Sequence, residues 1–225
     1  MRHVRSLGGI LLGKTNCPPG GGGLFTDNEV YGRTNNPYDL SRTPGGSSGG
    51  EAAAIATGMS PYGFGTDSGG SVRVPAHFCG IAAILPTARL LPVSGVVDDE
   101  GPIGTISDPR TRGIMARSVG DLCLVLREIT PIPTTEESVV PLSGRNSADV
   151  SLSELRISVQ MNNRIASPTD ETKRTIATAA RILEQAGGSV SEADPPPGGH
   201  ELTHEVWHSY AGEMRTAELY SIMRR

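Results

Sequence analysis

The sequence predicts an α/β protein with a mixed, largely parallel sheet flanked by helices. The main observation is a strand, helix, strand pattern over residues 155–193, because such a unit places two strands parallel with a helix packed on them. The composition agrees, since 36% of the 225 residues are hydrophobic and 20% are charged, close to the globular average. The 29 glycines and 17 prolines indicate many turns between the elements.

The first third of the chain contains one predicted strand and one predicted helix. Residues 10–12 are an apolar run between glycines and predict a buried strand, whereas residues 17–23 (CPPGGGG) predict a loop. Residues 51–57 (EAAAIAT) are helix formers, and Gly58 ends this helix. The serine pair at 47–48 therefore lies at a helix N-terminus.

The second half contains a capped helix and the strand, helix, strand unit. Residues 118–129 begin with Ser, carry Asp three positions later and continue with an apolar stripe, as in a capping box. Residues 155–160 alternate as in a strand, and residues 168–186 carry apolar side chains at helical spacing. The glycine pair at 187–188 closes that helix before residues 189–193 resume a strand.

Charge and cysteine content limit the partners. The net charge is −4 and the arginines are scattered, so we expect neither nucleic acid nor a membrane as a partner, but a small molecule. Cys17, Cys79 and Cys123 are an odd number without CxxC spacing, which indicates a reducing, cytoplasmic location. No apolar run approaches the roughly 20 residues of a membrane-spanning helix.

One glycine-rich segment is misleading. Residues 8–15 (GGILLGKT) fit the phosphate-binding pattern GxxxxGK[ST], with Lys14 in the lysine position. A phosphate loop exposes its amides and opens a helix, but residues 10–12 are bulky and apolar, and residues 17–20 (CPPG) break any helix. We therefore do not expect a nucleotide site here.

Two Gly-Gly-Ser turns, 24 positions apart, carry Ser47 and Ser71. Glycines on both sides let the backbone adopt positive φ, so such a turn exposes a hydroxyl and directs successive amides at one point. A single segment of this kind would be an ordinary loop. The pair favours a site built around serine hydroxyls.

The second turn has the features of an oxyanion hole. Asp67 and Arg73 lie on either side of the glycines in FGTDSGGSVRVPA, so an ion pair between them would brace the loop. A free backbone amide aimed at developing negative charge contributes about 3–4 kcal/mol. The predicted donors are the amides of Ser68, Gly69, Gly70 and Ser71.

Residues 43–87 resemble the signature of the amidase-signature family of serine hydrolases, through the motifs GGSSGG and GTDSGGSVR. Residues 9–16 resemble the strand before that signature, and residues 114–129 resemble the helix after it. The resemblance implies a partial, incomplete amidase-signature domain over residues 1–225. It also implies cleavage of a carboxamide C–N bond in a small linear amide through a serine acyl-enzyme, without a cofactor or metal.

The resemblance assigns roles to individual residues. Ser71 matches the family's nucleophile, and Ser47 matches a serine in an unusual cis peptide, which relays the proton of the nucleophile. Ser48 matches a supporting hydroxyl, beside the loop that Asp67 and Arg73 are expected from their own positions to support. The family's base is an unprotonated lysine, a state that requires burial.

The chain departs from the family at this lysine. The catalytic lysine belongs on a segment before residues 9–16, whereas Lys14 matches a non-catalytic lysine and Lys173 lies on the polar face of a distal helix. We therefore expect a chain truncated at both ends and impaired in turnover, and the alternative is an inactive amidase relic or fragment. Exposed sheet edges would favour a homo-oligomer and poor solubility.

Histidines offer two further interpretations. His77 follows Ser71 by six positions, but its place in a PAHFCG turn favours a structural role. His200, His204 and His208 recur every four residues, and HELTH fits the pattern of a helical zinc metallohydrolase with Glu as base. The prolines and glycines directly before it indicate a frayed helix start. The zinc enzyme is the second alternative.

Overall fold

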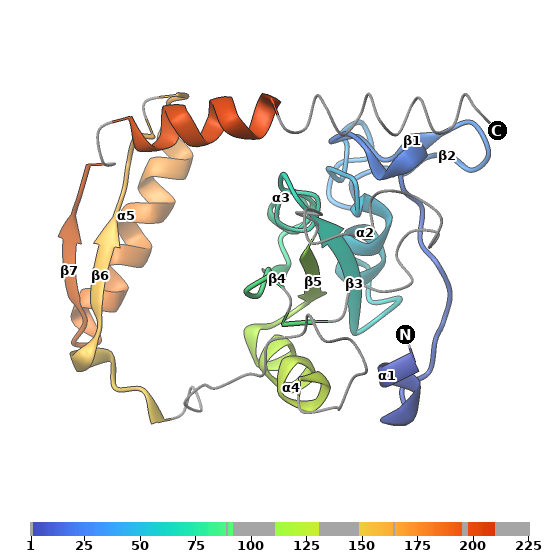
Figure 1. Cartoon of the computed structure of the whole chain (residues 1–225), viewed down its shortest axis with the longest axis horizontal. Coiled ribbons are helices and arrows are strands. Elements are labelled where there is room, and N and C mark those ends of the chain that lie inside the picture. Colours follow the sequence, from blue (N-terminus) through green and yellow to red (C-terminus); the bar gives the residue numbers. More distant parts are fainter. Residues whose placement is uncertain are drawn as a thin grey trace. The chain divides into compact units, whose positions relative to one another are not determined.

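The structure is a computed structural model of the chain (Figure 1). It describes residues 2–88, 90–91, 111–130, 149–163, 165–194 and 198–209. The chain divides into two compact units, residues 1–143 and residues 144–225. Within the described ranges, no helix has the length and apolar character needed to cross a membrane.

The first unit is built on a three-stranded antiparallel sheet in the order β3, β5, β4. Tyr62 pairs with Ala116 at one end of the β3–β5 ladder, and Asp67 pairs with Thr111 at the other. A separate antiparallel pair joins β1 and β2. The elements of this unit are α1 (Arg2–Ser6), the 3₁₀ turn η1 (Pro19–Gly21), β1 (Asp27–Asn28), β2 (Gly32–Arg33), α2 (Gly49–Ala56), β3 (Tyr62–Asp67), α3 (Arg73–Phe78), β4 (Ala82–Ile84), β5 (Thr111–Ala116) and α4 (Val119–Ile129).

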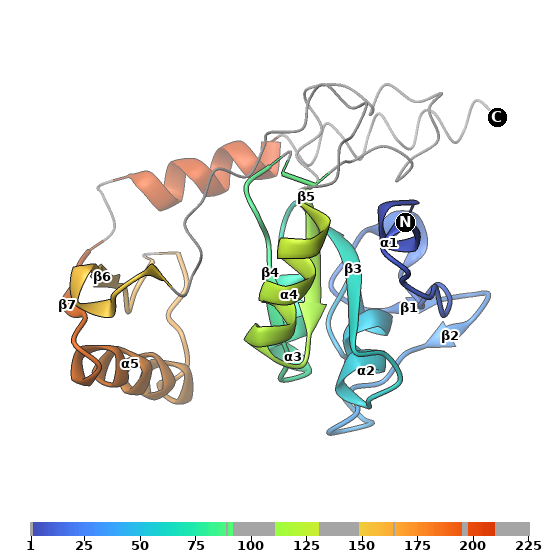
Figure 2. The same ribbon diagram turned by 90° about the horizontal axis from the view of Figure 1, so that it is seen from below.

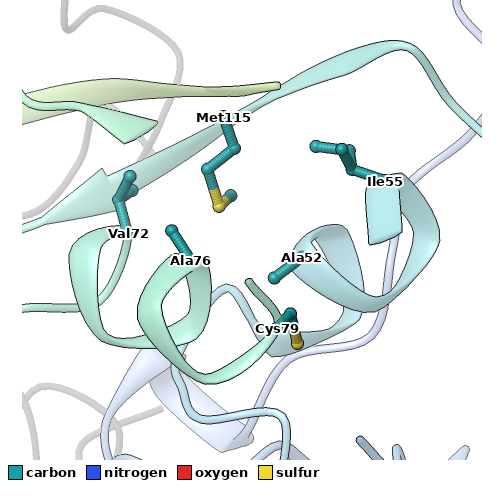
Figure 3. Close-up of a cluster of buried hydrophobic side chains, with 6 residues drawn as sticks. All are labelled: Ala52, Ile55, Val72, Ala76, Cys79 and Met115. Atoms are coloured by element: carbon teal, nitrogen blue, oxygen red, sulfur yellow. The ribbon is translucent and has the colours of Figure 1, made fainter. Parts of the chain in front are cut away.

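Each face of this sheet carries its own apolar core. Met115 of β5 packs with Ile55 of α2 and with Val72 at the start of α3 (Figure 3). Its neighbour Ile114 packs instead with Leu122 of α4, which covers the opposite face (Figure 2), because successive side chains of a strand alternate between faces. The first core therefore fixes the starts of α2 and α3, where the two serine turns lie.

The second unit pairs β6 with β7 in parallel, with α5 as the crossover helix (Figure 1). Thr169 caps α5 by accepting the amide of Thr172, and Gly187 follows the helix with a φ of 99°. The elements are the 3₁₀ turn η3 (Leu152–Glu154), β6 (Arg156–Val159), α5 (Asp170–Gln185), β7 (Ser189–Glu192) and a helix over residues 199–209.

The α/β class, the predicted helices and the strand, helix, strand unit are confirmed. α2 begins two residues before the predicted start, directly after Ser48, and Gly58 follows its end with a φ of 80°. α4 begins after Ser118, whose hydroxyl accepts the amide of Asp121 at 3.1 Å. The parallel strands β6 and β7 lie inside residues 155–193 as predicted.

Three expectations are wrong for the described strands. The sheet is not largely parallel. In the first unit, β5 lies between β3 and β4 and pairs antiparallel with both. β1 and β2 are also antiparallel, so β6–β7 is the only parallel pair in the described ranges. Residues 10–12 form no strand, and Ile10 is 84% exposed, because no described strand pairs with this run. Residues 114–129 are not helical throughout, since β5 extends to Ala116.

Candidate active site

The first Gly-Gly-Ser turn is buried and leads into α2. Gly45 has a φ of 86°, and the peptide bond between Gly46 and Ser47 is cis, as the resemblance implied for this serine. Ser47 is 5% exposed, and Ser48 is the N-cap residue of α2. The buried hydroxyl of Thr26 donates to the carbonyl of Gly45 at 2.8 Å and so ties the turn to the preceding loop.

Gly46 packs directly on backbone, and we expect Gly46→Ala to destabilise the first unit by about 1–3 kcal/mol. A Cβ atom there would lie 2.7 Å from the carbonyl oxygen of Gly23 and 2.9 Å from the amide nitrogen of Phe25. Urea unfolding followed by circular dichroism measures the effect. Gly22→Ala is the matched control, since its φ is −98° and a Cβ there meets nothing within 4 Å. Equal unfolding midpoints for the two variants would contradict the packing.

The second turn is organised around the buried carboxylate of Asp67. Oδ1 accepts the amide of Gly70 at 2.6 Å, and Oδ2 accepts the amide of Val72 at 2.9 Å. The guanidinium of Arg73 donates from Nε at 3.0 Å and from Nη2 at 2.8 Å. The predicted ion pair is therefore confirmed as a bidentate one, and it braces the turn that carries Ser71.

These hydrogen bonds set the charge state of Asp67. Burial alone would raise the pKa of the carboxyl group, but the Arg73 guanidinium and then the amides of Val72 and Gly70 outweigh it. The pKa of Asp67 therefore lies below its ordinary value of 3.8. The carboxylate is charged at neutral pH, so the ion pair is present there.

A backbone hydrogen bond joins the two serine turns. The amide of Ser48 donates to the carbonyl of Ser71 at 3.1 Å. The Ser48 side chain packs on β3, where a Cβ at Gly65 would collide with its hydroxyl. Ser71 is half-buried. The structure thus brings Ser47, Ser48 and Ser71 together from turns 24 positions apart in the sequence.

The predicted set of four free amides is wrong for Gly70. Its N–H is committed to Asp67, because the turn folds back over the carboxylate. In the described part of the chain, the amides of Gly69 and Ser71 donate to no protein acceptor. Ser68 is exposed at the start of the turn. The arrangement therefore offers two unpaired amides, those of Gly69 and Ser71, next to the Ser71 hydroxyl.

Sequence reasoning missed Glu51, in the first turn of α2. Its carboxylate accepts the hydroxyl of Thr15 at 2.8 Å, and a Cβ on Gly63 would collide with it. Burial raises the pKa of Glu51 above its ordinary value of 4.5, and the Thr15 hydrogen bond offsets only part of this. The Ser-x-x-Glu spacing from Ser48 was the available signal, although here the carboxylate binds Thr15.

Glu51→Gln is expected to raise the thermal midpoint at neutral pH. The glutamine carbonyl still accepts from Thr15, and the partly buried charge is removed. Because burial raises the pKa of Glu51, its charge destabilises the fold only as the pH rises through that pKa. In thermal unfolding followed by circular dichroism, the gain should therefore vanish below the ordinary value of 4.5. Glu51→Ala loses the Thr15 bond and is the control, and an equal gain in both variants would contradict the explanation.

Neither lysine occupies a buried position. Lys14 is exposed. Lys173 belongs to the second unit, where its ammonium nitrogen lies 3.9 Å from Asp170. His77 is exposed in the last turn of α3, and its ring contacts Phe78. None of these three side chains has the burial that an unprotonated amine base requires.

The HELTH segment lies on the helix over residues 199–209. Nε2 of His200 lies 3.1 Å from Oε1 of Gln160, whereas Nε2 of His204 lies 3.0 Å from Nε2 of His208. Among the residues that the structure describes, no three or more metal-ligating side chains gather. The structure therefore does not pair His200 with His204 as the zinc metallohydrolase alternative requires.

Comparison with known proteins identifies the family. The family model described as amidase matches residues 1–222. A glutamyl-tRNA(Gln) amidotransferase subunit of Roseiflexus castenholzii is 35% identical over 197 residues, which are 86% of this chain and 39% of that protein. The 6-aminohexanoate-cyclic-dimer hydrolase of Paenarthrobacter ureafaciens is 35% identical over 202 residues, which are 87% of this chain and 40% of that protein.

Solved structures of amidases share the fold. Fatty acid amide hydrolase matches with a TM-score of 0.82 at 29% identity, over 93% of this chain and 37% of that one. A structure of 6-aminohexanoate cyclic dimer hydrolase with its substrate matches with a TM-score of 0.73 at 34% identity, over 88% of this chain and 42% of that one. The chain spans about 40% of the length of these relatives. The family match and the shared fold show that this chain belongs to the amidase family of amidase-signature enzymes.

Proposed function

We propose that this chain carries the nucleophile and the oxyanion hole of an amidase, in which Ser71 attacks the carbonyl of a small linear amide. The observation that carries the proposal is the backbone hydrogen bond from Ser48 to Ser71, because it holds the two serine turns together. The unpaired amides of Gly69 and Ser71 supply donors beside the nucleophile, and the ion pair of Asp67 holds their turn. Membership of the amidase family supports the same chemistry.

The proposed reaction is an acyl transfer. Oγ of Ser71 bonds to the carbonyl carbon while its proton passes to Ser47, which gives its own proton to a base. The amides of Gly69 and Ser71 stabilise the negative charge on the carbonyl oxygen. Collapse of the tetrahedral intermediate breaks the C–N bond, the amine leaves with a proton, and water then hydrolyses the acyl-enzyme. By resemblance the base is a lysine, which needs a buried position that neither Lys14 nor Lys173 has.

A fluorophosphonate probe tests the proposal. The wild-type chain should be labelled, and mass spectrometry of the labelled peptide should place the adduct on Ser71. Ser71→Ala should abolish labelling, whereas Ser41→Ala, at an exposed serine of the same unit, should retain it. Circular dichroism verifies that each variant folds. Folded wild-type protein that takes no label would contradict the proposal and favour the inactive relic.

We propose a small linear carboxamide as the substrate, as the resemblance to the family implies, and the net charge of −4 gives no support for a nucleic acid instead. The names of two relatives specify other substrates for those proteins, glutamyl-tRNA(Gln) and a cyclic dimer of 6-aminohexanoate. Competition against the probe distinguishes these classes. A linear anilide should slow labelling of Ser71 more than a cyclic amide of equal size, and the reverse order would refute the assignment.

We also propose that the chain self-associates. Large apolar side chains are exposed along residues 7–40 of the first unit, where Ile10 is 84%, Tyr31 81% and Val30 79% exposed. Exposed apolar surface of this kind favours association. Sedimentation over a concentration series measures it, and a chain that stays monomeric throughout would contradict the expectation.

A further inference from the structure

Two histidines of the second unit remain unused by the proposed amidase chemistry. His204 and His208 lie one turn apart on the helix over residues 199–209, drawn in red in Figure 1. Both are exposed, their ring centroids are 4.2 Å apart, and a hydrogen bond joins their Nε2 atoms at 3.0 Å, so an ion bound between them would take the place of that hydrogen bond. Residues four apart on a helix share a face, so the helix itself holds this pair.

We propose that His204 and His208 form a two-histidine site for a divalent copper ion. Imidazole nitrogen is a preferred ligand of transition metals. At metal–nitrogen distances of about 2.0–2.1 Å, two nitrogens 3.0 Å apart subtend an angle of about 90–100° at a shared ion. That angle matches adjacent positions of a tetragonal ion better than the tetrahedral angle that zinc adopts, and Cu(II) is the tetragonal ion that nitrogen ligands bind most tightly.

This site differs from the HELTH zinc site. A zincin site would use His200 and His204, but Nε2 of His200 is engaged with Oε1 of Gln160 at 3.1 Å. Glu201 and Glu205 precede the two histidines by three positions each and lie within one turn of them. Their negative charge attracts a cation, and water completes the coordination of an exposed ion.

The fluorescence of a neighbouring tryptophan can report binding at this site. Trp207 is the single tryptophan of the sequence. Its ring meets the His208 ring edge-on, with centroids 5.1 Å apart and planes at 89°. A paramagnetic copper ion bound to His208 would therefore lie close enough to quench the fluorescence of Trp207.

Titration of the full chain with copper(II) chloride tests the proposal. All proteins carry His3→Ala, because its imidazole is a nitrogen ligand outside the proposed site. Trp207 fluorescence should fall and saturate at one copper ion per chain. His204→Ala and His208→Ala should each weaken the binding by at least about tenfold. The matched control His200→Ala, on the same helix, should bind as tightly as the His3→Ala parent, and zinc should bind more weakly than copper.

Circular dichroism shows whether each variant keeps its helix, so loss of binding is separated from loss of fold. Quenching that survives in both His204→Ala and His208→Ala would overturn the proposal. Loss in His200→Ala and His204→Ala with retention in His208→Ala would overturn it in favour of the HELTH pair. The readout does not involve Ser71, so its failure leaves the amidase proposal unaffected.

Discussion

Asp67→Ala is expected to destabilise the first unit by about 2–6 kcal/mol, because two buried amides lose their acceptor at about 1–3 kcal/mol each. These are the amides of Gly70 and Val72. Arg73 adds less, since its side chain is 55% exposed and water replaces the lost partner. The same change should abolish labelling of Ser71, whose turn loses its anchor. Urea unfolding followed by circular dichroism and probe labelling measure the two effects.

Two further variants identify the cause. Asp67→Asn keeps the shape of the side chain but replaces one acceptor oxygen by an NH₂ group. This NH₂ would face the N–H donors of the turn and of Arg73, so the variant should also destabilise the fold substantially. Asp121→Ala removes an exposed carboxylate that accepts the Ser118 hydroxyl, and it should cost far less. Comparable losses in Asp67→Ala and Asp121→Ala would show that the buried carboxylate does not organise the turn.

The ion pair also predicts an acid dependence. Because the pKa of Asp67 in the fold lies below 3.8, the carboxylate contributes stability above that value and loses it as the pH falls through the folded pKa. The stability gap between wild type and Asp67→Asn should therefore be constant near neutral pH and shrink below pH 3.8. A gap that does not change with pH would exclude the charge as its source.

The parts of the fold that the sequence predicted depend on signals between near neighbours. Ser118 and Asp121 marked the start of α4, and Gly58 marked the end of α2. Each signal involves a few adjacent backbone groups and needs no distant partner. The pair of Asp67 and Arg73 was predictable for the same reason, since only six positions separate them.

The parts that could not be predicted depend on distant contacts. β3 contains Gly63 and Gly65, which lower its strand propensity. Both glycines are explained only by the fold, because the side chains of Glu51 and Ser48 pack where a Cβ would lie. The engaged amide of Gly70 likewise follows from the conformation of the turn around Asp67. No local pattern records such contacts.

The 225-residue chain is expected to hydrolyse amides about 10⁴–10⁶-fold more slowly than an amidase with a complete serine, serine, lysine set. A serine hydroxyl attacks poorly until a base accepts its proton. The two lysines of the sequence are Lys14, which is exposed, and Lys173, which lies near Asp170 in the second unit. Release of nitroaniline from a small anilide, compared with 6-aminohexanoate-cyclic-dimer hydrolase at equal concentration, measures the difference.

The residual hydrolysis rates of lysine and serine variants distinguish an active site that lacks only its base from a site with no activity. Lys14→Met and Lys173→Met should leave the slow residual rate unchanged, because that rate derives from the amides of Gly69 and Ser71 and from substrate binding. Ser71→Ala should reduce it to the background. Loss of the rate in Lys14→Met alone would make Lys14 the base and refute the expectation. The rate of Ser71 labelling should be low in parallel with the turnover, because attack on the phosphonate needs the same proton acceptor as attack on an amide.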